Sequence, residues 1–81
     1  MKKLSLKELK KITKRYIDGD MDSVKISKWA ANVNWKYAGS ELKFVGGDKR
    51  EMLDFIFELM HLNDERFADS KVTLQKKLEE L

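Results

Sequence analysis

The sequence predicts an all-α fold: a compact four-helix antiparallel bundle that forms a single domain over residues 1–81. The chain contains no proline and only four glycines, and its many Lys, Glu and Leu residues favour helices. Apolar residues recur at helical spacing along four segments. A chain of 81 residues has enough side chains for one core only, so we expect one domain.

The first helix is expected to begin at Ser5, because Glu8 follows three residues later, as in a capping box. Its predicted core face consists of Leu6, Leu9, Ile12, Tyr16 and Ile17. The helix should end near Asp18, where Gly19 suits a left-handed residue. A short turn then leads to Asp22, which is expected to cap the second helix.

The second helix is expected to bury a narrow stripe made of Ile26, Trp29, Ala30, Val33 and Tyr37. Trp35 lies six residues after Trp29, which places it roughly opposite this stripe. Either the chain bends near Asn34 and Trp35 returns to the core, or Trp35 is exposed. An exposed tryptophan is a natural anchor for a protein partner.

One ordered loop is expected between the second and third helices. Gly39 and Ser40 precede it, and its apolar residues Leu42, Phe44 and Val45 are too few to predict a sheet. Asp48 should then cap a third helix, which is apolar around much of its circumference. The apolar side chains of this segment are Met52, Leu53, Phe55, Ile56, Phe57, Leu59, Met60 and Leu62. A last helix should start near Asp69 or Ser70 and bury Leu74, Leu78 and Leu81.

Chemistry-bearing residues are few. The only histidine, His61, follows Glu58 by three residues, but a di-iron site needs this motif twice. A calcium loop starting at Asp18 would have Ser23 and Trp29 where glycine and glutamate are required. The chain has no cysteine and no nucleotide-binding glycine loop. We therefore predict a non-enzymatic protein without catalytic residues, metal or cofactor.

Charge is unevenly distributed. Residues 1–17 carry seven basic residues and one acidic residue, whereas the rest of the chain carries ten basic and thirteen acidic residues. A basic helix face of this kind can bind nucleic acid, although lysines also populate solvent-exposed faces of ordinary helices. The residues that would bind phosphates in this alternative function are Lys7, Lys10, Lys11, Lys14 and Arg15.

A family resemblance starts at the first turn. The run from Tyr16 to Ser23, the segment Ile26-Ser27-Lys28-Trp29-Ala30, the apolar third helix and the closing leucine helix resemble small bacterial immunity-type helical proteins. The chain is most similar to colicin D immunity-like families. This resemblance implies a bacterial protein that binds and neutralises a toxin domain, often a nuclease with a basic cleft.

The resemblance also implies acidic residues at the partner interface. Besides Trp35, the predicted partner-binding residues are Asp18, Asp20, Asp64, Glu65 and Asp69, with Asp22 at the same edge. A homodimer that closes over Trp35 and Phe44 is an alternative to a monomer. The N-terminus has no apolar run typical of a signal peptide or membrane span, so we expect a cytoplasmic protein that does not bind membranes.

Overall fold

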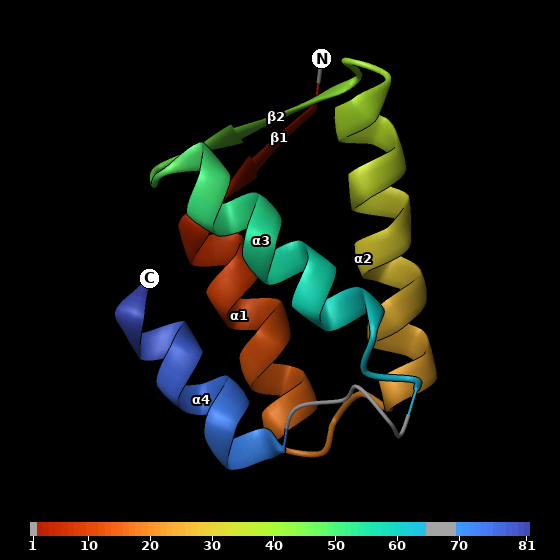
Figure 1. The fold of residues 1–81 in the computed structure, drawn as a ribbon, viewed down its shortest axis with the longest axis vertical. Helices are drawn as coiled ribbons and strands as arrows, with labels where there is room; N and C mark the ends of the chain where they lie inside the picture. Colours follow the sequence, from red (N-terminus) through yellow and green to blue (C-terminus); the bar gives the residue numbers. More distant parts are fainter. Residues whose placement is uncertain (1, 65–69) are drawn as a thin grey trace.

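The computed structural model describes residues 2–64 and 70–81 (Figure 1). Its elements are, in chain order, β1 (Lys2–Ser5), α1 (Leu6–Ile17), α2 (Ser23–Ala38), β2 (Leu42–Val45), α3 (Lys49–Met60) and α4 (Lys71–Glu80). The four predicted helices are therefore present within these ranges. The strands show that the fold is mostly helical rather than all-α.

Each helix begins at a residue whose side-chain oxygen accepts a hydrogen bond from an amide of the first turn. The Ser5 hydroxyl accepts from Glu8 N at 3.1 Å, and the Asp22 carboxylate accepts from Lys25 N at 2.7 Å. Asp48 accepts from the amides of Arg50 and Glu51 in the same way, and Ser70 accepts from Thr73. These bonds satisfy amides that the helix itself leaves unpaired, so the predicted helix starts are confirmed.

The prediction of an ordered loop without a strand between α2 and α3 is wrong. Residues 42–45 form β2, which pairs in parallel with β1 so that Leu4 lies opposite Phe44 and Lys3 opposite Lys43. The pleat turns Leu4, Leu42 and Phe44 to the interior, where they are 5%, 9% and 1% exposed. Two helices connect the strands, and the sheet closes one end of the molecule (Figure 1).

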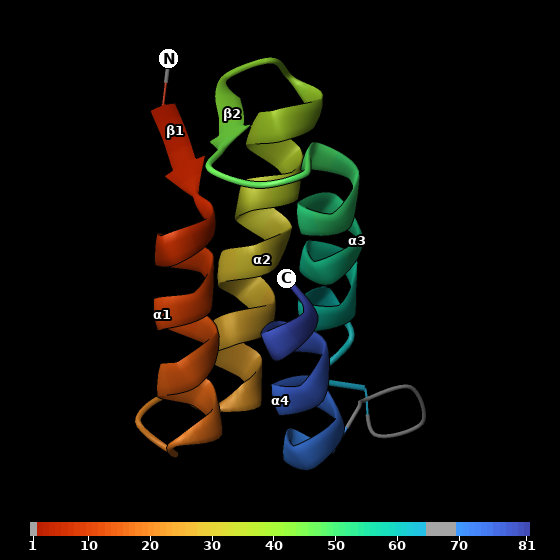
Figure 2. The same cartoon turned by 90° about the vertical axis from the view of Figure 1, so that its left-hand side faces the viewer.

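The helices surround one hydrophobic core. α2 packs most extensively on α3, whereas α4 packs on α1 (Figures 1 and 2). Fully buried side chains come from each helix, and they include Leu9, Ile26, Ala30, Met52, Ile56, Leu59 and Leu74. Tyr37 of α2 stacks on Phe44 of β2 with ring centroids 4.6 Å apart, which joins the sheet to the helices. None of the helices that the structure describes is both long and apolar enough to cross a membrane.

Two polar side chains are buried at positions that the apolar pattern does not predict. The Thr13 hydroxyl donates to the carbonyl oxygen of Leu9 at 2.8 Å within α1. The Ser27 hydroxyl, on α2, donates to the carbonyl oxygen of Leu59 at 3.1 Å and accepts from Asn63 N at 3.1 Å. Ser27 thus holds the end of α3 against α2.

Candidate functional site

The outer side of α2 carries an exposed and mostly apolar stripe that includes Trp35. α2 continues past Asn34 to Ala38 without a bend, so Trp35 stays opposite the buried side and is 78% exposed. The sequence left open whether Trp35 returns to the core or is exposed, and the structure shows that it is exposed. Val24 on the same side is 50% exposed. We call this stripe the outer α2 face, and its residues are Val24, Lys28, Ala31, Trp35 and Ala38.

The predicted acidic residues gather at the opposite end of α2 from Trp35. Asp18 and Asp20 are exposed in the turn between α1 and α2, and Asp22 is the cap of α2. Asp64 follows α3, next to the Asn63 amide that Ser27 binds. Figure 1 shows both segments at the end of the molecule that is farthest from the sheet. Glu65 and Asp69 lie outside the described residues.

The structure does not bring Trp35 and the acidic residues into one compact site. From Asp22 to Trp35 the chain rises by thirteen helical residues, or about 20 Å at 1.5 Å per residue. The whole molecule measures 31 × 22 × 20 Å along its principal axes, so the two groups lie far apart for its size. The outer α2 face runs between them.

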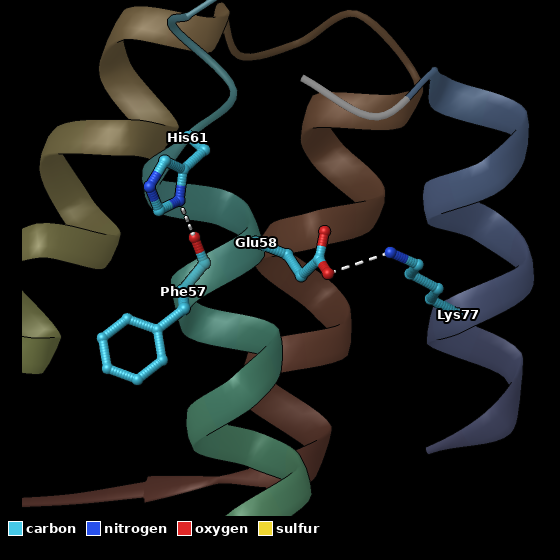
Figure 3. Close-up of polar contacts among 4 residues, drawn as sticks. All are labelled: Phe57, Glu58, His61 and Lys77. Carbon is cyan, nitrogen blue, oxygen red and sulfur yellow. Dashed lines mark hydrogen bonds and ion pairs between the residues drawn. The ribbon is translucent and has the colours of Figure 1, made fainter. Parts of the chain in front are cut away.

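Glu58 and His61 have separate partners, as Figure 3 shows. The Glu58 carboxylate forms an ion pair with Lys77 of α4, with 2.9 Å between Oε1 and Nζ. His61 Nδ1 lies 2.7 Å from the carbonyl oxygen of Phe57. A carbonyl oxygen only accepts hydrogen bonds, so we assign the proton to Nδ1. The two side chains point away from one another and do not form a shared ligand pair.

An open depression of about 540 Å³ lies beside these residues. Phe57, which is 40% exposed, lines it together with Asp54, Glu58, His61 and Asp64. Phe57 is one of the apolar residues that the sequence places around the third helix, and it lies on the exposed side of that helix. The signal was present in the spacing, because Asp54, Phe57, Glu58 and His61 recur at helical intervals on one side of α3.

The lysines of α1 lie together. Four of them line one groove of about 440 Å³ between α1 and α4, whose other lining residues are Gln75, Leu78 and Glu79. Those four are Lys7, Lys10, Lys11 and Lys14. Arg15 does not line this groove; it lines a smaller depression with Glu8, Ile12 and Lys11, and Lys11 borders both. The sequence predicted the basic face of α1, but only the packing of α4 reveals that the lysines border a groove.

The alternative of a homodimer that closes over Trp35 and Phe44 is contradicted at one of these two residues. Phe44 is 1% exposed and stacks on Tyr37, so it has no surface to offer a second copy. Trp35 alone of the pair lies on the surface.

Within residues 2–64 and 70–81, no group of three or more His, Asp or Glu side chains is arranged to hold a metal ion. No protein-family model, curated protein or solved structure matches this chain.

Proposed function

We propose that this protein is a non-enzymatic protein-binding module that contacts its partner through the outer α2 face, with Trp35 as the anchor. The observation that carries the proposal is the 78% exposure of Trp35 on a helix whose opposite side is buried in the core. Leaving an indole in water forgoes a large amount of hydrophobic burial, and such aromatic residues supply much of the binding energy at protein interfaces.

The rest of α2 supports this role for Trp35. The inner side of the helix is held by Ile26, Ala30 and Val33, which are at most 6% exposed, so the backbone beneath the indole is rigid. Ala31 and Ala38 lie one turn on either side of Trp35 and do not cover it. A partner therefore meets a preorganised aromatic side chain and loses little conformational entropy on binding it.

The partner we favour is a toxin domain with a basic surface. The resemblance to immunity-type proteins motivates this choice, and the exposed Asp18 and Asp20 beside the start of α2 supply carboxylates for a basic partner. The lysine groove borders α4, and Figure 1 places α4 and α2 on opposite sides of the molecule. The basic face of α1 would then be turned away from a partner bound on α2.

Substitution of Trp35 tests the proposal. The protein and its Trp35→Ala variant are each used to recover partners from cells of the source organism, and the recovered proteins are quantified by mass spectrometry. We expect one protein to be lost with Trp35→Ala, and its dissociation constant to rise by about a hundredfold once purified, as expected for a residue worth roughly 3 kcal/mol.

Val72→Ala is the matched control, because Val72 is 69% exposed on α4 and is not part of the outer α2 face. Recovery of the partner should be unchanged with this variant. The proposal is refuted if Trp35→Ala removes no protein from the recovered set while the variant melts at the same temperature as the parent.

The toxin form of the proposal has its own test. If a reading frame adjacent to this gene encodes a toxin domain, co-expression should restore growth to cells that produce that domain. Asp18→Lys together with Asp20→Lys should weaken this protection. Protection that is unchanged by these two substitutions and by Trp35→Ala contradicts the assignment of the interface.

A further inference from the structure

The groove between α1 and α4 is lined mostly by carbon, although four lysines border it. Leu78, which is 6% exposed, contributes to its floor. Lys10 is half-buried, so part of its aliphatic stem also lies against the protein. The groove thus combines an apolar floor with a basic wall.

The two walls of the groove differ in charge. The α1 wall carries Lys7, Lys10, Lys11 and Lys14, which recur at the intervals of one helix face. The α4 wall presents Glu79, whose Oε1 accepts a hydrogen bond from Gln75 Nε2 at 3.2 Å. A ligand that fills the groove therefore needs apolar groups against the floor and negative charge facing the lysines of α1. It should carry no negative charge on the side that faces Glu79.

We infer that this groove binds an acidic amphipathic helix of a protein partner. A helix that places leucine-type side chains on the floor and carboxylates along one flank matches both the carbon surface and the charge of the α1 wall. Nucleic acid fits less well, because a phosphate backbone gains nothing from an apolar floor. The groove residues also include no arginine to read bases and no aromatic ring to stack on them. This second binding surface is independent of Trp35.

Peptide binding tests the inference. The probe is a fluorescently labelled synthetic helix of about five turns with leucines along one face and glutamates along one flank. Binding to the full chain is followed by fluorescence anisotropy at low salt. A second peptide has the same composition in scrambled order, a third has lysine in place of glutamate, and a single-stranded oligonucleotide is the fourth probe.

We expect only the acidic amphipathic peptide to bind with appreciable affinity. The triple substitution of Lys7, Lys11 and Lys14 to Glu should raise its dissociation constant at least about tenfold, because it replaces three attractive charges with repulsive ones. Lys25, Lys43 and Lys49 are exposed lysines away from the groove, and their triple substitution to Glu is the matched control with the same net charge. It should leave the affinity within about twofold.

Three outcomes overturn the inference. Equal binding of the scrambled peptide shows that the apolar floor is not used. An equal loss of affinity in both triple variants shows that net charge alone attracts the peptide. Tighter binding of the oligonucleotide, with an affinity that falls steeply with salt, assigns the lysines to nucleic acid instead. Circular dichroism and thermal melting of each variant establish that the fold is retained.

Discussion

Among individual residues, Ser27 is an unexpectedly important one, because a small polar side chain occupies a buried position between two helices. It is 4% exposed and bonds both the carbonyl oxygen of Leu59 and the amide of Asn63. The Leu59 carbonyl also accepts from Leu62 N, whereas the Ser27 hydroxyl is the acceptor that the structure gives the Asn63 amide. The loss of stability on removing the Ser27 hydroxyl should therefore come mainly from the Asn63 amide, which would lose this acceptor.

Ser27→Ala should lower the free energy of unfolding by about 1–2 kcal/mol, because it leaves a partly buried amide without its acceptor. Urea denaturation measures this change. Thr13→Val is the matched control, since Thr13 is equally buried but bonds a carbonyl that the helix already satisfies. It should cost less than about 1 kcal/mol. An equal loss in both variants would show that the contact with the end of α3 has no special role.

Lys36 provides a residue whose contribution depends on pH. The Lys2 side chain, through a hydrogen bond and its charge, lowers the pKa of Lys36 below the ordinary value for lysine, with a smaller lowering from desolvation, while Glu41 opposes the change. A lowered pKa means that folding favours the neutral amine. The pair therefore opposes folding at neutral pH, and this cost disappears as the pH rises through the lowered pKa.

Lys36→Gln should accordingly raise the melting temperature at pH 7, because it removes the repulsion from Lys2. The gain should shrink as the pH approaches the region in which lysines lose their protons, near about pH 10. Melting curves across this range check the prediction. Lys25→Gln serves as the control, since Lys25 is an exposed lysine on the same helix. A gain that increases with pH would contradict the explanation.

At the level of elements, the pairing of β1 with β2 fixes the N-terminal strand against the segment that follows α2. Lys3 and Lys43 lie opposite one another in the parallel register and are both exposed, so the sheet places two like charges side by side. Directly opposed like charges weaken a strand pair, whereas opposite charges stabilise it. The register can therefore be tested through these two residues.

Lys43→Glu should stabilise the protein by roughly 0.2–1 kcal/mol, the usual range for an exposed cross-strand pair. Adding Lys3→Glu should remove that gain, because two glutamates then face each other. A double-mutant cycle on the free energy of unfolding isolates the interaction. Lys49→Glu, outside the sheet, should show no coupling to Lys3. Coupling as large for Lys49 as for Lys43 would refute the register.

For the whole molecule, two aromatic residues nine positions apart in sequence have opposite environments. Phe44 is enclosed by the core and stacks on Tyr37, whereas Trp35 lies on the surface. Burial of a large side chain supports the entire cooperative core, but an exposed one contributes little to folding. Substitution of Phe44 should therefore reduce stability, whereas substitution of Trp35 should reduce partner binding and leave stability nearly unchanged.

Phe44→Ala should lower the free energy of unfolding by about 3–5 kcal/mol, as expected when a buried aromatic side chain leaves a cavity. Trp35→Ala should change it by less than about 0.5 kcal/mol. Guanidinium denaturation of both variants measures the contrast. A loss of several kcal/mol with Trp35→Ala would place the indole in the core and remove the basis for the proposed interface.

Local signals account for the part of the structure that the sequence alone determined. The caps at Ser5, Asp22 and Asp48, and the buried stripes that contain Leu9, Ile26 and Leu74, depend on residues within about one helical turn of each other. Such short-range patterns can be recognised without knowing how the helices pack. The exposure of Trp35 was left open, because a bend in α2 would have reversed it.

The tertiary structure alone decided which distant segments meet. β1 and β2 are separated by two helices, and the four-residue segment Leu42–Val45 forms a strand only because another strand supplies its hydrogen-bond partners. The lysines of α1 become the wall of a groove only because α4 packs beside them, and Ser27 becomes a buried contact only because α3 ends against it. These features depend on contacts between residues far apart in the chain, whose pairing no local periodicity encodes.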